Sequence, residues 1–323
     1  PFYVYLGWQC LRYGISPKNL AKANYALDHG EIGLGSKFDT QRKFDAEQFP
    51  VTRYLAANLT KEQRLEQVKG FATKQGYPII LKPDIGVTGK GLVKLDSDER
   101  LATQLDKLEG GYLLQSFCQM PLEFGVFYCR IDGHSQITGI NQKHFPCVTG
   151  DGRKTVLQLA HAHPRYTEHW HAFLQYVDTS RVPQADEEVL LSFIGAHTLG
   201  CLFTDDSYLL TDELHTAVCE FVGPVSGYNF GRLDLRTDNV AGLQKGEFTV
   251  IEVNGISSLP THMFDPKYTL LQAYNIFFEH ARYLVCAAKD NAHQPMALMS
   301  LLDVARKVRV SQRRLNRLHS RKE

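Results

Sequence analysis

The sequence predicts an α+β fold, and three features lead to that prediction. Two short alternating runs, 228–236 and 247–254, flank a linker rich in Gly, Asp and Asn, as two antiparallel strands joined by a loop would. Apolar runs at 79–81 and 92–95 enclose a glycine-rich turn, which is typical of a second strand pair. Amphipathic stretches such as 268–288 supply the helices.

Length and composition are those of an ordinary globular chain. At 323 residues it can bury a large core, and two or three subdomains are expected. Hydrophobic residues make up 43% and charged residues 22%, as in soluble globular proteins. The net charge of +1 gives no reason to expect a polyanionic partner for the molecule as a whole.

Cysteine usage and targeting signals favour the cytoplasm. Seven cysteines, an odd number without a Cys-x-x-Cys pair, indicate reduced thiols rather than a disulfide framework. No apolar run is long enough to span a membrane, and no secretory signal peptide is visible. Because the chain begins with Pro1 and not with Met, we expect a processed chain or a fragment.

The first half of the chain is expected to alternate helices and short strands. Ser36 is a suitable N-cap for an amphipathic helix at 36–49, which must end before Pro50. The other elements predicted here are a strand-like run at 1–8, a helix at 17–29, helices at 59–75 and 98–108, and a buried strand at 112–117.

The second half adds a hairpin and further helices. Strands at 124–130 and 136–143 turn at Asp132-Gly133. The glycines of 148–159, with Arg153 and Lys154, either face an anion at a helix N-terminus or simply form a capped helix entry. Helices are also predicted at 187–199, 212–221 and 268–288.

The strands at 228–236 and 247–254 carry the residues with the clearest chemistry. Side chains alternate between the faces of a strand, so Arg232 and Asp234 share one face, and Glu252 shares a face with Asn254. Ile251 and Val253 are expected to point into the opposite layer. If the strands pair, a guanidinium, two acids and an amide converge, which suits Mg²⁺ and a phosphate. The alternative is a surface hairpin with weak cross-strand ion pairs.

The hairpin at 77–95 is a second candidate for phosphate binding. Its first strand delivers Lys82, a compact positive charge suited to an anion. Glycines let backbone N–H groups approach a phosphate without a Cβ in the way. The lysine precedes the glycines and a strand follows them, so this is not a P-loop. Read alone, the segment is an ordinary glycine-rich hairpin.

In this order the segments ILKPDIGVTGKGL, LLQSF, PLEF, GRLDLR and IEVNG resemble the ATP-grasp superfamily, especially its D-alanine–D-alanine ligase-like, carboxylate–amine ligase branch. The resemblance covers about Gly35 to Lys289. It implies an ATP-grasp fold, in which two α+β subdomains enclose ATP. The implied parts are a reduced N-terminal segment at 1–36, an N-subdomain at 37–117, a C-subdomain at 118–290 and a basic helical tail at 291–323.

The resemblance also implies roles for individual residues, with ATP and Mg²⁺ (or Mn²⁺) as cofactors. The residues implied to bind the triphosphate are Lys37, Lys82, Gly86, Gly89, Lys90, Gly91 and Lys143. Main-chain atoms of Gln115, Ser116 and Phe117 are placed at the adenine, and Glu123 at the ribose. Asp234, Glu252 and Asn254 are the implied metal ligands, and Arg232 and Lys82 the catalytic residues. Ser257 and Ser258, with Thr261, lie on a loop that contacts the acceptor's carboxylate in that branch.

The implied activity is an ATP-dependent, ADP-forming ligase that joins a carboxylate to an amine through an acyl phosphate. Two alternatives remain open at this point. One is a small-molecule kinase, which stops after phosphoryl transfer. The other is a non-catalytic nucleotide-binding scaffold. Small-molecule carboxylate and amine substrates and a homo-oligomer are the expected partners.

Two further segments stand apart from these motifs. His161, His163, His169 and His171 suggest zinc, but no acid or cysteine completes a recognisable spacing and Pro164 interrupts the helix, which favours surface or substrate-side histidines. The stretch 296–323 predicts a basic amphipathic helix. It suits RNA, an acidic partner or an anionic membrane surface, or it is a solvated helix docked on its own domain or on a second subunit.

Overall fold

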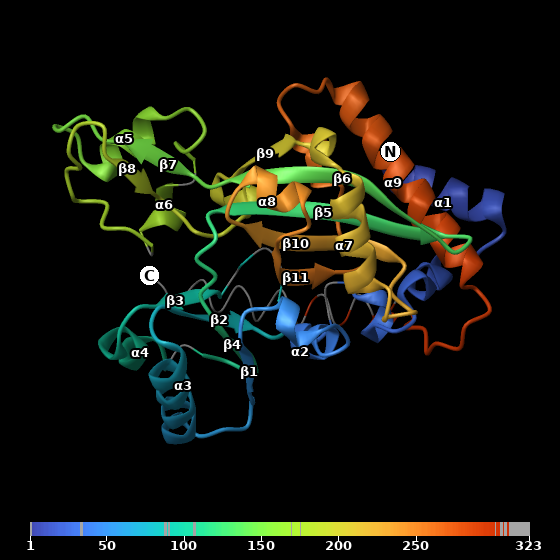
Figure 1. Ribbon diagram of the computed structural model, residues 1–323, viewed down its shortest axis with the longest axis horizontal. Coiled ribbons are helices and arrows are strands. Elements are labelled where there is room, and N and C mark those ends of the chain that lie inside the picture. Colours follow the sequence, from blue (N-terminus) through green and yellow to red (C-terminus); the bar gives the residue numbers. More distant parts are fainter. Residues whose placement is uncertain are drawn as a thin grey trace.

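Two antiparallel sheets, joined by a short connection, form the framework of the structure (Figure 1). The computed structural model describes residues 2–32, 35–86, 89, 91–105, 108–168, 170–174, 176–300, 302, 303, 306 and 309. The predicted α+β class is confirmed. Most of the predicted tail at 296–323 lies outside the described residues, and the predicted subdomain boundaries stay predictions.

The smaller sheet holds the glycine-rich hairpin. Its strands run in the order β1-β4-β2-β3 and are covered by helices α3 and α4. The bounds are β1 Thr52–Leu55, α3 Lys61–Gln75, β2 Ile79–Pro83, β3 Val93–Leu95, α4 Asp98–Gln104 and β4 Tyr112–Ser116. Helix α3 begins with a capping box, in which Thr60 accepts from the Gln63 backbone and the Gln63 side chain accepts from Thr60. The strands and helices predicted in this region are confirmed.

The larger sheet has the strand order β11-β10-β5-β6-β9. Its elements are β5 Leu122–Ile131, β6 His134–His144, β9 Leu202–Asp205, α7 Asp212–Val222, β10 Phe230–Thr237, α8 Val240–Gln244 and β11 Thr249–Asn254. One face buries alternate apolar side chains such as Val126, Leu233 and Leu235. Helix α7 lies over this face (Figure 1). The polar side chains between these apolar ones are therefore left on the opposite face.

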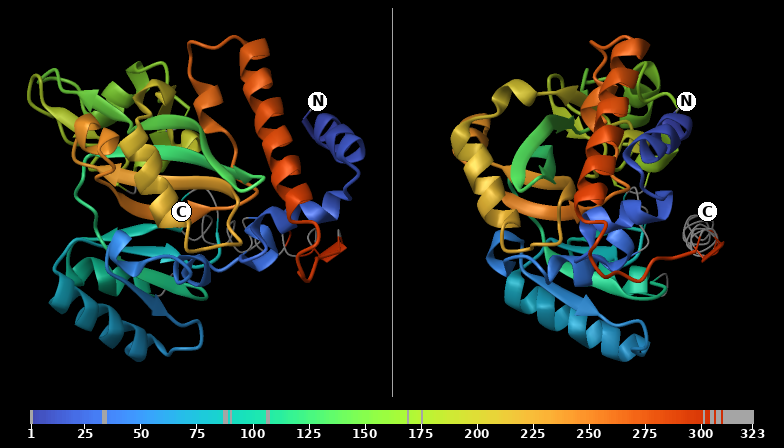
Figure 2. Two further views of the ribbon diagram at one scale, coloured as in Figure 1. Left: turned by 45° about the vertical axis from the view of Figure 1, so that its right-hand side comes forward. Right: turned by 90° about the vertical axis from the view of Figure 1, so that its right-hand side faces the viewer.

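The N-terminal segment differs from the sequence prediction. Residues 1–8 were expected to form a strand, but α1 spans Phe2–Tyr13 and lies beside α9, Leu270–Asp290 (Figure 2). Phe2 stacks on Phe277 at 3.8 Å and Tyr5 on Phe278 at 4.4 Å between ring centroids. A short apolar run does not distinguish a strand from a helix, and here packing on α9 decides. The helix expected at 17–29 is instead two 3₁₀ segments, η1 Pro17–Asn24 and η2 Asp28–Gly30.

Two other predicted helices are also corrected. The helix expected at 36–49 is only α2, Lys37–Gln41, capped by Ser36 and followed by the 3₁₀ turn η3, Ala46–Gln48. The helix expected at 187–199 is β8, Glu188–Leu190, then an irregular stretch and the 3₁₀ turn η5, His197–Leu199. Val189 and Leu191 are buried while Leu190 is exposed, so the segment follows the two-residue period of a strand.

Residues 145–196 form a satellite unit with its own small core at one end of the larger sheet (Figure 1). Strand β7, Cys147–Thr149, pairs with β8, and the helices are α5 Val156–Ala162 and α6 Trp170–Phe173. Two further 3₁₀ turns, η6 Ser207–Leu209 and η7 Thr261–Phe264, complete the described elements.

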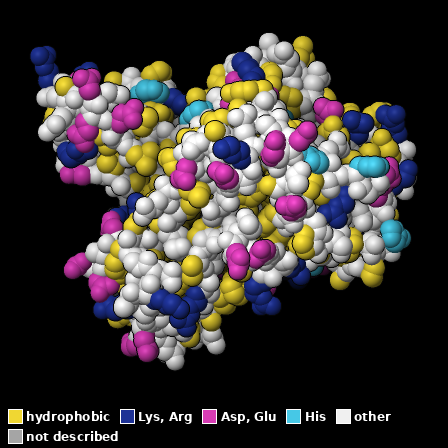
Figure 3. Space-filling model, in the orientation of Figure 1, with side chains coloured by type: hydrophobic (Ala, Val, Ile, Leu, Met, Phe, Trp, Pro, Cys, Tyr) yellow, Lys and Arg dark blue, Asp and Glu magenta, His cyan; other side chains and the backbone are white. Residues whose placement is uncertain are grey.

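The surface has no dominant sign of charge on the side seen in Figure 3, where acidic and basic side chains are interspersed. Among the described residues, no helix combines the length and the apolar character that crossing a membrane requires.

Two buried histidines on the pocket side of the larger sheet predict a loss of stability in mild acid. Burial lowers the pKa of His262 to about 4 and that of His280 to about 3, whereas both titrate near 6.5 in an unfolded chain. The unfolded chain therefore binds more protons below pH 6.5. The free energy of unfolding should fall by about 2 kcal/mol per histidine between pH 7 and pH 5.

Urea denaturation at pH 7, 6 and 5 measures this slope. His280→Gln removes one titrating group and keeps an N–H donor for the Ser258 carbonyl, to which His280 Nε2 bonds at 2.8 Å. The variant should lose roughly half of the pH dependence, whereas His134→Gln, at an exposed position, should lose none. A wild-type stability that is flat between pH 7 and 5 would show that these histidines are not neutral in the fold.

Candidate functional site

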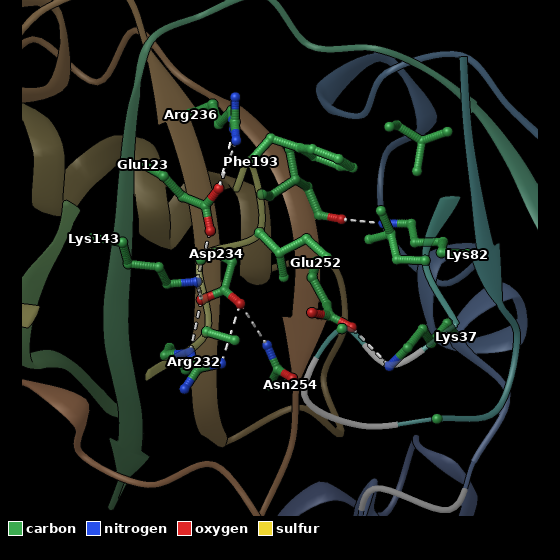
Figure 4. Close-up of a pocket in the computed structure, with 18 of the residues that line it drawn as sticks. Lys37, Lys82, Glu123, Lys143, Phe193, Arg232, Asp234, Arg236, Glu252 and Asn254 are labelled. Atoms are coloured by element: carbon green, nitrogen blue, oxygen red, sulfur yellow. Dashed lines mark hydrogen bonds and ion pairs between the residues drawn. The ribbon is translucent and has the colours of Figure 1, made fainter. Parts of the chain in front are cut away.

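A cavity of about 510 Å³ lies between the two sheets (Figure 4). The residues predicted from the sequence that line it are Lys37, Lys82, Gly86, Gly89, Gln115, Ser116, Phe117, Glu123, Lys143, Arg232, Asp234, Glu252, Asn254, Ser257 and Ser258. Gly91 does not line the cavity, and Lys90 lies outside the described residues. Among the residues that the structure describes, five Lys or Arg and four Asp or Glu line this space, so it suits a multiply charged ligand.

Strands β10 and β11 pair as the alternation predicts. Arg232 lies opposite Asn254, and Asp234 lies opposite Glu252. The structure brings a guanidinium, two carboxylates and an amide together in one cavity, as expected. The expectation for Ile251 is wrong, because a β-bulge between Asp234 and the next pair turns Ile251 toward the cavity beside Glu252.

A chain of buried ion pairs crosses the floor of the cavity. Lys143 Nζ lies 2.8 Å from Glu123 Oε1 and 3.0 Å from Asp234 Oδ1, and Arg232 Nε lies 2.7 Å from Asp234 Oδ1 (Figure 4). Burial alone would raise the pKa of Asp234, but the charges of Arg232 and Lys143 lower it to about 2. Burial likewise opposes the charge of Lys143, yet its two carboxylate neighbours raise the pKa of its ammonium. Asp234 and Lys143 are therefore both ionised at neutral pH.

Two lysines reach the same floor from the other side. Lys37 Nζ lies 2.7 Å from Glu252 Oε1, and Lys82 Nζ donates to the Ile251 carbonyl at 2.9 Å. β11 is the edge strand of its sheet, so it has backbone carbonyls that no neighbouring strand uses. Burial lowers the pKa of Lys82, with Glu252 opposing it only in part, whereas Glu252 raises the pKa of Lys37 above its usual range despite burial. An anion placed between the lysines would stabilise the charged form of both.

Asp84 positions both lysines, and the sequence reading missed it. Its carboxylate accepts from Ser36 Oγ at 2.9 Å and from the Phe38 backbone at 3.0 Å, and its carbonyl accepts from the Lys37 backbone at 3.0 Å. Asp84 directly follows β2, the strand that carries Lys82, so it fixes the start of α2 to the end of that strand.

Arg236 was also missed, although it shares a face with Arg232 and Asp234. Its Nε and Nη2 donate to Glu123 Oε2 at 3.1 and 3.0 Å. Its Nη1 donates to the carbonyls of Cys118 and Met120 at 3.4 and 3.3 Å. Both oxygens of Glu123 thus have protein partners, and Arg236 ties the connection between the sheets to the cavity floor.

Residues 115–117, which the resemblance places beside the adenine, already have hydrogen-bond partners within the protein. The N–H of Ser116 bonds to the Val51 carbonyl at 3.0 Å, and that of Phe117 bonds to the Pro78 carbonyl at 3.3 Å. The side chain of Gln115 donates to Thr52 at 3.0 Å. A backbone N–H donor to a nucleobase at this place must therefore come from a residue other than Ser116 or Phe117.

The satellite unit adds residues that no motif indicated. Phe193 meets Phe117 edge to face at 6.4 Å, and Lys94 lies over Phe117 at 4.3 Å. Gly195 lies directly on the Glu123–Lys143 pair, since a Cβ there would be 2.5 Å from Glu123 Oε1 and 2.7 Å from Lys143 Cδ. Only glycine fits against the ion pair at this position.

For a metal, the donors on β10 and β11 fit Mg²⁺ in kind. Asp234, Glu252 and Asn254 present two carboxylates and an amide oxygen to one cavity, and Mg²⁺ binds one or two carboxylates together with phosphate oxygens. Over the residues that the structure describes, no group of three or more His, Cys, Asp or Glu is arranged as a ready-made metal site. Of the predicted histidine cluster, His163 stacks on Tyr166 at 4.0 Å, and His169 lies outside the described residues.

The chain is similar to several known structures at low sequence identity. The structure is similar to those of ATP-grasp enzymes. A D-alanine–D-alanine ligase from Bacillus anthracis matches with a TM-score of 0.46 and 12% identity, over 83% of this chain and 71% of that one. The ATP-grasp ligase PsnB, complexed with a minimal precursor, matches with a TM-score of 0.40 and 13% identity, over 77% and 60%.

A bifunctional glutathione synthetase from Pasteurella multocida matches with a TM-score of 0.38 and 15% identity, over 76% of this chain but only 35% of its own length. No protein-family model and no curated protein matches the chain. With TM-scores below 0.5, these matches say nothing about activity, so the chemistry rests on the chain's own residues.

Proposed function

We propose that the chain is an ATP-dependent ligase that joins a carboxylate to an amine and releases ADP and phosphate. The observation that carries the proposal is the meeting of two charged walls in one cavity. Lys37 and Lys82 face Asp234, Glu252 and Asn254 across a space that also contains Arg232 and Lys143. Lysines suit the phosphates of a nucleotide, and the opposite wall suits the metal ion that accompanies them.

The proposed reaction has two steps. A carboxylate oxygen of the first substrate attacks the γ-phosphorus of ATP, the bond to the β,γ-bridging oxygen breaks, and ADP leaves with that electron pair. The amine nitrogen then attacks the acyl carbon, the C–O bond to phosphate breaks, and phosphate leaves. The amine loses one proton to phosphate or solvent. Positioning and charge stabilisation supply most of the catalysis of phosphoryl transfer.

The chain's residues divide this work by location. The triphosphate would be held by Lys37, Lys82 and the N–H groups near Gly86 and Gly89. Lys143 would add a further positive charge beside it. Glu123 would accept from a ribose hydroxyl through Oε1, which keeps a lone pair beyond its bond from Lys143, whereas Oε2 already accepts twice from Arg236. Asp234, Glu252 and Asn254 would hold Mg²⁺, which would neutralise charge on the transferred phosphoryl group. Arg232 would stabilise the acyl phosphate and the tetrahedral adduct through charge-assisted hydrogen bonds.

An ADP-release screen tests this proposal. The full chain, ATP and Mg²⁺ are combined with small carboxylates, alone and paired with amines, and products are identified by mass spectrometry. A ligase produces ADP, free phosphate and an amide only when both substrates are present. A stable phosphorylated product would instead identify a kinase, and the absence of both ATP binding and ADP release would refute the proposal.

A further inference from the structure

The cavity extends beyond Lys143 to the β9 edge of the larger sheet, where its lining changes character. Strand β9 pairs with β6 so that Phe203 lies opposite Lys143. His197, Leu259 and Phe264 line the same cavity. The His197 ring contacts both phenylalanine rings, at 5.7 Å from Phe203 and 5.1 Å from Phe264. We call these four residues the apolar wall.

Two members of the apolar wall, Leu259 and Phe264, are partly exposed, whereas Phe203 behind them is buried. Leu259 is 43% exposed and Phe264 is 36% exposed, although both line the pocket. Removing such surfaces from water is favourable, so a ligand with an apolar group gains affinity here. The segment 256–264 contains no Asp, Glu, Lys or Arg. A charged side chain on the ligand would find no counterion in this segment.

Hydroxyl groups beside the apolar wall are oriented as acceptors. Ser258 Oγ donates to the Gly255 carbonyl at 2.6 Å, and Thr261 Oγ1 donates to Asn141 Oδ1 at 2.7 Å. Each hydroxyl has one hydrogen, so once it is donated only lone pairs remain for a ligand. Both residues line the cavity and are more than nine-tenths buried. These two hydroxyls therefore complement N–H groups and not a carboxylate.

This polarity differs from what the family resemblance implies for the loop, which is contact with the acceptor's carboxylate. Ser257 follows the same rule, because its Oγ donates to the Glu31 carbonyl at 3.4 Å. With both serine protons directed at backbone carbonyls, neither hydroxyl donates into the cavity.

We propose that the amine substrate carries an apolar side chain, with its N–H groups on the Ser258 and Thr261 hydroxyl oxygens and its side chain against Leu259 and Phe264. Amino acids of the leucine and phenylalanine type have this chemistry. The inference rests on the proposed function, because it assigns the second substrate of the same reaction.

Calorimetric binding to the full chain, loaded with Mg²⁺ and a non-hydrolysable ATP analogue, tests the proposal without turnover. The probes are leucine and phenylalanine in both enantiomers, glycine, glutamate, and 4-methylpentanoate, which is leucine without its amino group. One enantiomer of leucine or phenylalanine should bind at least 10-fold more tightly than glycine or glutamate. It should also bind at least 10-fold more tightly than 4-methylpentanoate, which leaves the hydroxyl acceptors unmatched.

Matched variants test the apolar contact and the hydroxyl contact separately. Phe264→Ala and Leu259→Ala should each weaken the binding of leucine about 10-fold and leave the binding of glycine unchanged. Leu210→Ala, an equally exposed leucine outside the cavity, should change neither. Ser258→Ala should lower the affinity for leucine to near that for 4-methylpentanoate. Thr261→Ser should keep the preference for a ligand with an amino group.

The outcomes also distinguish this inference from the proposed function. If the analogue binds but leucine, phenylalanine and glycine bind alike, the apolar assignment is wrong and the ligase proposal stands. If Ser258→Ala weakens leucine and 4-methylpentanoate equally, the hydroxyls do not receive the amine. If the analogue itself does not bind, the proposed function fails, and this inference fails with it.

Discussion

Glu252→Gln should reduce ATP turnover by about 100- to 1,000-fold and leave the fold intact. The substitution keeps the shape of the side chain but removes the negative charge that pairs with Lys37 and faces the proposed metal. Catalysis of phosphoryl transfer depends on fixed charges around the phosphate, so the loss should appear in kcat. The side chain of Glu252 is 30% exposed, which limits the cost to stability.

Steady-state ADP release and thermal unfolding, measured on the same preparation, check this prediction. Glu220→Gln on the exposed side of α7 is the matched control and should behave as wild type. Wild-type turnover in Glu252→Gln would remove Glu252 from the site. Asp234→Asn is a less clean test, because Asp234 is the shared partner of buried Arg232 and Lys143 and its loss should also destabilise the fold.

Glu123→Gln should lower the free energy of unfolding by about 3–5 kcal/mol. Glu123 is 3% exposed and lies between Lys143 and Arg236, both of which are also buried. The amide keeps the volume and can still accept hydrogen bonds, but it leaves Arg236 without its carboxylate partner and leaves Lys143 to share Asp234 with Arg232. An unbalanced buried charge costs more than the original pair contributes.

Urea denaturation at pH 7 measures the effect. Glu187→Gln is the matched control, because Glu187 pairs with Arg181 at 2.7 Å on the exposed satellite unit and its loss should change little. The double variant Glu123→Met with Lys143→Met should be less destabilised than Glu123→Gln, since it removes a charge of each sign. If Glu123→Gln is as stable as wild type, the buried pairs do not determine the stability of the floor.

The core of the site could be predicted because its residues follow the strict period of a strand. Arg232, Asp234, Glu252 and Asn254 alternate with apolar residues, so pairing the two strands was enough to bring them together. Lys37 and Lys82, the proposed partners of a phosphate, could be joined to this site only through the resemblance to a family, because no local pattern places them near β11.

Other features depend on contacts that are distant in the sequence. The bulge that turns Ile251 toward the cavity leaves no mark in the pattern of apolar residues. Arg236 reads as one more charge at the end of a strand until Glu123 is seen beside it. Helix α1 forms where its aromatic rings find those of α9, far along the chain. Tertiary packing decided each of these cases.

Glu252 links the charges of the cavity to the separation of the two sheets that enclose it. Lys37 and Lys82 reach from the smaller sheet's side to Glu252 and the adjacent Ile251 carbonyl. A triphosphate that engages these lysines competes with those contacts, so occupancy and the separation of the two sheets become linked quantities. A substitution on β11 that changes the affinity for an anion should therefore also change the separation of the two sheets when the anion leaves.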